Sequence, residues 1–109
     1  KETDITHMIN TNIKNNHIQI ENLYKSIFSD LPYTSIKLED HSVTIQHNDK
    51  DNSDAATLEI IEDSSGYRLN YWDGYSVVET VENKDLKKAL KIFKNTAKKM
   101  AKNLRRFSD

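Results

Sequence analysis

The sequence predicts an α+β domain: an N-terminal helix, then a four- to five-stranded antiparallel meander, then a long C-terminal amphipathic helix. Two observations predict it. Apolar residues recur about every 3.6 positions near both ends of the chain, and they alternate every two positions between those ends. An order of helix, meander and helix places both helices on one face of the sheet. The other face is then open to solvent or to a partner.

The N-terminal helix is predicted from Ile5 to Leu31, where eight apolar residues fall on one stripe. Asp4 is placed to cap its start, and Pro32 ends it because proline cannot continue a helix. Asparagines are poor helix formers and cluster in the first half of this segment. We therefore expect residues 1–8 to fray.

The strands are predicted where the apolar period changes to two. Residues 35–38 and 43–47 flank the polar turn "EDHS", and an acidic loop follows over residues 48–56. Residues 57–63 and 67–73 form a hairpin around "SSG", in which Gly66 supplies the backbone angles that such turns need. Gly74 separates this hairpin from a last strand over residues 75–82.

The C-terminal helix is predicted over residues 84–107. Its apolar residues fill one arc of about 120°, as expected of a helix that packs on one side. All ten of its basic residues fall on the opposite arc. Asn83 is placed to cap this helix, and Asp85 complements the helix dipole.

The composition fits a single domain over residues 1–109. A chain of 109 residues is long enough for one hydrophobic core, and a hydrophobic share of 36% makes that core lean. The absence of cysteine excludes disulfides, thiolate zinc sites and cysteine nucleophiles. No apolar run approaches the ~18 residues of a membrane span. A chain that begins at Lys1 fits a trimmed or a processed form, so localisation stays open between the cytoplasm and a secreted or anchored state.

The charges are separated along the chain. Residues 1–83 hold 6 Lys or Arg against 15 Asp or Glu, a net of −9, whereas residues 84–109 hold 10 against 2, a net of +8. A solvated helix face accounts for some of these lysines. However, Glu–Lys pairs four residues apart, which usually relieve the repulsion, are almost absent. So many uncompensated cations cost stability, which suggests that they have a use.

Three partners compete for this basic helix. Nucleic acid would be held through its phosphates, by Lys87, Lys91, Lys94, Lys98, Lys102 and Arg105, although the acidic body would oppose its approach. An anionic membrane would need the apolar face of the helix, which the sheet is expected to occupy. An acidic groove on another protein, or the acidic body of a second copy, meets neither objection.

The stretch "YRLNYWDGYSVVE" indicates a second surface. If Leu69 points inward, strand alternation turns Trp72 outward, near Asp73 and Tyr75. Exposed aromatic residues beside carboxylates are typical of binding hot spots, and Glu59 and Glu79 are expected on the same face. The competing interpretation is that Trp72 fills the core at the bend made by Gly74.

Patterns of catalytic or metal-binding chemistry are missing. The four histidines have no metal-ligand spacing, and the EF-hand-like "DKDNSD" lacks the glycine and the glutamate that calcium loops need. With only two glycines there is no phosphate-binding loop. We therefore expect no enzymatic activity, no metal and no cofactor.

The leading hypothesis is a non-enzymatic protein-binding module. Most concretely, it would be a small antagonist, such as an immunity protein or an inhibitor of a nucleic-acid-handling enzyme, that occupies a basic site with an acidic, aromatic sheet face. A composition rich in Asn, Lys and Ile suits an AT-rich microbial or phage genome. The alternative is a nucleic-acid-binding module that uses the basic helix. Self-association between the basic helix and an acidic body is a third hypothesis.

Overall fold

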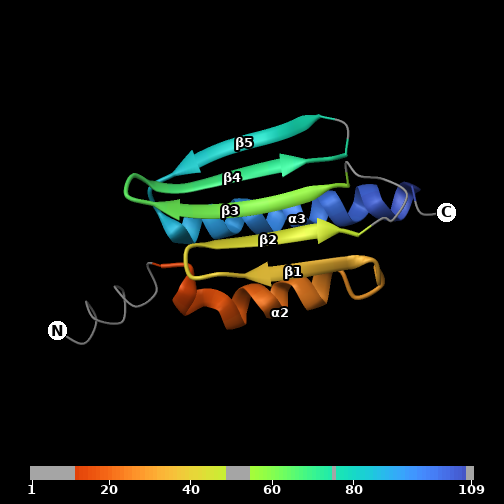
Figure 1. The fold of residues 1–109 in the computed structure, drawn as a ribbon, viewed down its shortest axis with the longest axis horizontal. Coiled ribbons are helices and arrows are strands. Elements are labelled where there is room, and N and C mark those ends of the chain that lie inside the picture. The colour runs from red at the N-terminus through yellow and green to blue at the C-terminus, as the bar shows by residue number, and fades with distance from the viewer. Residues whose placement is uncertain (1–11, 49–54, 75, 108–109) are drawn as a thin grey trace.

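The fold is α+β, with two helices and a five-stranded antiparallel sheet, as predicted (Figure 1). The computed structural model describes residues 12–48, 55–74 and 76–107. The helical elements are the 3-10 turn η1 (Lys14–Asn16), α2 (His17–Ile27) and α3 (Leu86–Phe107). The strands are β1 (Thr34–Leu38), β2 (Ser42–His47), β3 (Thr57–Asp63), β4 (Gly66–Trp72) and β5 (Val77–Asn83).

The sheet has the order β1-β2-β3-β4-β5, so every strand pairs antiparallel with its neighbours in the sequence. Both helices lie on one face of it. In Figure 1, α3 passes behind the sheet, and α2 lies along the β1 side. The other face carries no helix of the described chain, and we call it the open face.

The core lies between the sheet and the two helices. Strand register aligns inward-facing apolar residues in rows across the sheet, such as Leu38, Val43, Ile60, Leu69 and Val81. Helix α3 covers these rows with six buried apolar side chains: Leu86, Ala89, Phe93, Ala97, Met100 and Ala101. Helix α2 adds Ile20 and Ile27. Burial of this apolar surface is the main force that stabilises the fold.

The N-terminal helix is shorter than predicted. Helix α2 begins at His17, and the predicted part from Ile5 to Thr11 lies outside the described residues, as do Asp4 and the fraying segment 1–8. Before α2, Asn12 accepts a hydrogen bond from the Asn15 backbone N–H at 2.9 Å, and the buried Asn16 side chain donates to the Asn12 carbonyl at 2.8 Å. Asparagine side chains compete for backbone groups in this way, which favours the 3-10 turn over a regular helix.

The predicted helix end at Leu31 is also wrong. Helix α2 ends at Ile27, and the Leu31 N–H donates to the Phe28 carbonyl across a tight turn. The residue before a proline is disfavoured in helical backbone angles, so Pro32 keeps Leu31 itself out of the helix. Leu31 is nevertheless buried, since the turn brings its side chain into the core.

Helix α3 is capped by Asp85 rather than by the predicted Asn83. The Asp85 carbonyl accepts the first helical hydrogen bond, from Ala89, and its carboxylate accepts the Lys87 N–H at 3.1 Å. Asn83 acts one step earlier, because its side-chain oxygen accepts the Asp85 N–H at 2.8 Å. Aspartate at this position also complements the helix dipole.

Gly66 begins β4 with a φ of +138°, a backbone angle that favours glycine. A Cβ atom at this position would lie 2.8 Å from the Asn83 carbonyl oxygen on β5. The predicted hairpin turn around Gly66 is confirmed, with β3 and β4 in register from Asp63–Gly66 to Thr57–Trp72. Of the predicted loop over residues 48–56, the segment 49–54 lies outside the described residues.

Candidate interaction surfaces

The open face is rich in hydroxyl and amide groups. Strand register places these side chains on it, row by row: Ser35, Gln46, Thr57 and Trp72; Lys37, Thr44, Glu59, Asn70 and Thr80; Ser42, Ile61, Arg68 and Glu82. These residues of the open face therefore include two glutamates, Glu59 and Glu82, and two basic residues, Lys37 and Arg68. The expected acidic sheet face is mixed in charge over the described rows, because Glu59 lies near Trp72, Glu82 lies at the other end, and Lys37 and Arg68 lie among them.

A shallow groove on the open face surrounds Trp72. Its lining residues are Thr57, Glu59, Asn70, Tyr71, Trp72 and Thr80, contributed by β3, β4 and β5. The Asn70 side chain donates to Glu59 Oε1 at 3.0 Å, which fixes that carboxylate beside the groove. Trp72 is half-buried. We call this site the Trp72 groove.

Asp73 follows Trp72 directly, in the turn between β4 and β5. Its Oδ1 atom accepts the Ser76 backbone N–H at 2.9 Å, and its own N–H donates to the Ser76 carbonyl at 3.2 Å. The turn therefore orders the Asp73 carboxylate, as Asp and Asn side chains commonly do in turns. The structure thus supplies two ordered carboxylates close to Trp72, from Glu59 and Asp73.

The five residues predicted for this site do not all come together. Trp72 and Glu59 share the groove, Asp73 adjoins it, and Tyr75 lies outside the described residues. The predicted placement of Glu79 on the same face as Trp72 is wrong, because Glu79 lies opposite the buried Tyr71 and so faces the helices. Its Oε2 atom is 3.6 Å from Lys99 Nζ on α3. Asn70, Thr57 and Thr80 were not predicted as site residues. Strand alternation could have placed Thr57 on the same face as Glu59, whereas Asn70 and Thr80 join the groove through the strand register.

The basic residues of α3 divide into paired and unpaired ones. Lys87, Lys91, Lys94, Lys98 and Lys102 are exposed and form no ion pair within the described part of the chain. We call these five lysines the basic ridge.

Arg105, predicted as part of the same surface, has another role. Its Nε and Nη2 atoms donate to the two carboxylate oxygens of Asp30 at 2.7 and 2.9 Å, and Nη2 also donates to the Ile27 carbonyl at 2.7 Å. The hydrogen bonds from Arg105 lower the pKa of the Asp30 carboxyl below its ordinary value. Arg105 therefore joins the ends of α2 and α3.

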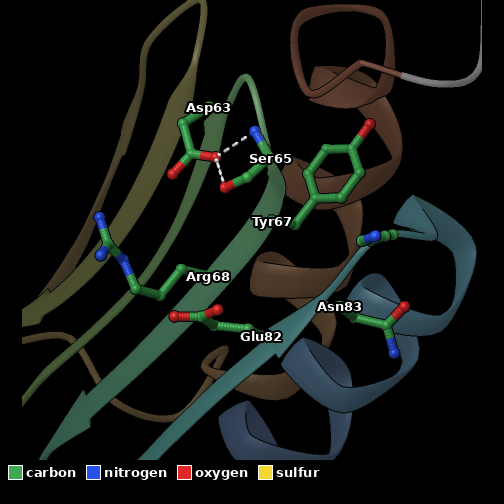
Figure 2. Close-up of a pocket in the computed structure, with 7 residues that line it drawn as sticks. Asp63, Ser65, Tyr67, Arg68, Glu82 and Asn83 are labelled. Atoms are coloured by element: carbon green, nitrogen blue, oxygen red, sulfur yellow. Dashed lines mark hydrogen bonds between the residues drawn. The ribbon is translucent and has the colours of Figure 1, made fainter.

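A polar pocket lies at the end of the β3–β4 hairpin (Figure 2). Asp63 Oδ1 accepts the Ser65 N–H at 2.8 Å and the Ser65 hydroxyl at 2.7 Å, and these bonds lower the pKa of Asp63. Arg68 lies opposite Glu82 in the strand register, while Tyr67 points toward the helices (Figure 2). These contacts stabilise the turn and the strand pair, and we assign no chemistry to the pocket.

The described histidines have separate surroundings. His17 Nε2 lies 2.7 Å from the Glu39 carbonyl, and His41 Nδ1 lies 4.0 Å from Glu62 Oε2. Within residues 12–48, 55–74 and 76–107, no three His, Asp or Glu side chains are grouped closely enough to hold a metal ion. His7 and the acidic residues Asp49, Asp51 and Asp54 lie outside those ranges.

Among the described helices, none combines the length and the apolar character that a membrane span needs. Comparison with family models, with curated proteins and with solved structures found no match to this chain. Its function has to be argued from its own surfaces.

Proposed function

We propose that this chain is a non-enzymatic protein-binding module, a small antagonist of the immunity-protein or inhibitor kind, that occupies a basic site on its partner with the Trp72 groove. One observation carries the proposal. A half-buried tryptophan lies on the open face of the sheet, close to two ordered carboxylates. Tryptophan is among the residues that most often dominate binding energy at protein interfaces.

The carboxylates at the groove are already held in place by hydrogen bonds, which favours binding of a partner. Asn70 already holds Glu59, and the β4–β5 turn already holds Asp73, so little side-chain freedom is lost when a partner binds. Glu59 is the only carboxylate among the described lining residues, and its Oε1 atom accepts from a neutral amide. Such an arrangement is suited to binding a positive charge.

The chemistry of the groove specifies the partner's anchor. An arginine or lysine side chain placed over the Trp72 ring would gain a cation–π contact and could pair with Glu59 or Asp73. The open face beyond the groove is charge-balanced, with Arg68 opposite Glu82. The basic site on the partner is therefore local, matching two carboxylates rather than a whole acidic face. Opposite charges at such a site speed association.

The test is capture of a partner from source cells by the wild-type chain and by two charge-matched double variants. Glu59→Gln/Asp73→Asn removes both charges at the groove but keeps oxygens that accept the Asn70 and Ser76 hydrogen bonds. Glu82→Gln/Asp63→Asn removes two charges at the other end of the sheet. Lysates are treated with nuclease, and captured proteins are quantified by mass spectrometry.

We expect one stoichiometric protein that the wild type and the Glu82/Asp63 variant retain and that the Glu59/Asp73 variant loses by at least tenfold. Equal capture by all three chains would overturn the role of the groove. Loss of every captured protein on nuclease treatment would overturn protein binding altogether.

A further inference from the structure

We infer that the basic ridge of α3 is a second binding surface, which holds the phosphate backbone of double-stranded DNA without sequence preference. This inference does not rest on the Trp72 groove, because the two surfaces belong to different layers of the fold. The ridge lies on the helix layer, and the groove lies on the helix-free face of the sheet.

The ridge is a straight line of charges. From Lys87 to Lys102 the five lysines are separated by three or four residues, so they repeat about once per helical turn. At 1.5 Å per residue they span about 22 Å, within an arc of roughly 80°. A row of this length can contact several phosphates of one duplex at once, since the duplex carries a charge every ~1.7 Å along its axis.

The ridge charges are available to a ligand. The structure pairs two other cations of α3 with carboxylates, Lys99 with Glu79 and Arg105 with Asp30. The ridge lysines have no such pair within the described residues. Because Arg105 is already paired, we expect the five aligned lysines of the ridge to contact phosphate without it.

The acidic residues do not block the approach of DNA to α3. Six of those described lie in the turns between strands or on the open face: Glu39, Asp40, Glu59, Asp63, Asp73 and Glu82. On the helix side, Glu79 and Asp30 are already paired with Lys99 and Arg105. The ridge lysines point away from the core, on the other side of α3 from the sheet. A duplex that approaches the helix layer meets the lysines before it meets this acidic surface.

The side chains of α3 favour a duplex backbone over other anions. Among its described large apolar residues, Leu86, Phe93 and Met100 are buried in the core, and Leu90, Ile92 and Leu104 pack against it. Among the described side chains, the ridge therefore presents no aromatic platform on which unpaired bases could stack, and no exposed apolar group that could enter a membrane or anchor a protein interface. Lysine is a point charge that binds phosphate without reading bases, so we expect no sequence preference.

The test measures binding of the full chain to a labelled 20-base-pair duplex by fluorescence anisotropy, over a range of salt concentrations. If all five lysines contact phosphate, log K falls against log salt with a slope of about −4.5, which is about 500-fold between 50 and 200 mM salt. Lys91→Gln/Lys98→Gln should reduce the magnitude of the slope by about 1.8. Lys14→Gln/Lys37→Gln removes the same charge from η1 and β1 and should leave the slope unchanged.

Four outcomes would overturn the inference. A slope near zero or an equal loss in both double variants would remove the ridge as the contact surface. Equal binding of a glutamate polymer with the same number of charges would assign the ridge to an acidic protein, and tighter binding of single-stranded DNA would remove the duplex as the ligand. The Glu59/Asp73 variant should bind DNA as the wild type does, so failure of this inference and failure of the proposed function are distinguishable.

Discussion

At the scale of single residues, Tyr71 connects the sheet to α3. Its side chain is 1% exposed, and its hydroxyl accepts a hydrogen bond from Asn103 Nδ2 at 3.1 Å. Burial raises the pKa of the Tyr71 phenol above its ordinary value near 10, although the hydrogen bond from Asn103 acts in the opposite direction. The folded state therefore favours the protonated phenol.

This arrangement predicts how stability depends on pH. A group whose pKa is raised by folding contributes stability that is fully present below its unfolded pKa and is lost as the pH rises through the folded pKa. We expect Tyr71→Phe to lower the free energy of unfolding by about 1 kcal/mol at pH 7, through loss of the hydrogen bond. Above pH 10 the difference between wild type and variant should shrink, because the variant has no phenol to ionise at this position.

Urea unfolding between pH 7 and pH 11 checks this prediction. Tyr33→Phe is the matched control, because Tyr33 is 70% exposed, and its removal should change stability by less than about 0.5 kcal/mol. A constant difference between wild type and Tyr71→Phe across the whole range would contradict the pKa shift.

The face chosen by each strand residue was only partly predictable from the sequence. Leu69 and Trp72 face opposite sides, as alternation along "YRLNYWD" predicts. The strand "YSVVETVE" is ambiguous, because each of its two alternating sets contains both valine and glutamate. The pairing of Val81 with Leu69 and of Glu79 with Tyr71 places the set that contains Val81 and Glu79 on the inward face. Glu79 was therefore assigned to the wrong face.

At the scale of elements, Arg105 joins the C-terminal part of α3 to the end of α2. Its planar guanidinium matches both Asp30 oxygens and still reaches the Ile27 carbonyl. Lysine cannot reproduce this geometry, because it is a single point charge. Arg105→Lys should therefore loosen the last turns of α3 while its charge is retained.

Amide hydrogen exchange measures this effect directly. We expect faster exchange at residues 100–107 in Arg105→Lys than in the wild type, with the strands unchanged. Arg106→Lys is the control. Arg106 is exposed and adjacent to Arg105, and the substitution is the same, but Arg106 is not the residue that pairs with Asp30. Equal exchange in both variants would show that the link does not hold α3 in place.

Element ends were harder to predict than element types. Periodicity identified both helices, because the apolar stripe of an amphipathic helix extends over many residues. The ends depend on single hydrogen bonds, such as that from Lys87 to Asp85 at the start of α3. Local competition between Asn12, Asn15 and Asn16 also converted a predicted helical turn to 3-10 geometry.

At the scale of the whole molecule, one layer of helices covers one face of one sheet, and α3 contributes much of that cover. Residues 1–83 alone would leave the inward rows of the sheet without Leu86, Phe93 and Met100. A sheet with an uncovered apolar face loses the burial that stabilises it. We therefore expect a chain of residues 1–83 to show no cooperative unfolding transition.

Circular dichroism during urea titration checks this expectation, and addition of a peptide of residues 84–109 provides the rescue. A sigmoidal transition for residues 1–83 alone would contradict it. The control is the full chain with Lys91→Gln/Lys98→Gln, in which only exposed residues change, so the transition should remain.

The fold class was predictable because whole-molecule patterns do not depend on any single residue. An order of helix, strands and helix, with short turns between strands, leaves few arrangements other than a meander covered on one face. The Trp72 groove was less predictable, because Thr57, Glu59 and Asn70 are brought together by strand register. The pairing of Arg105 with Asp30, 75 residues apart in the sequence, left no local signal.

The position of Trp72 also gives the molecule a built-in optical probe. It is the single tryptophan in the chain, and it lies half-buried on the helix-free face of the sheet. Indole emission therefore reports on the groove, while the ridge on α3 lies on the other side of the sheet. Intrinsic fluorescence can follow occupancy of the groove in unlabelled protein, even while a second ligand is bound to the helix.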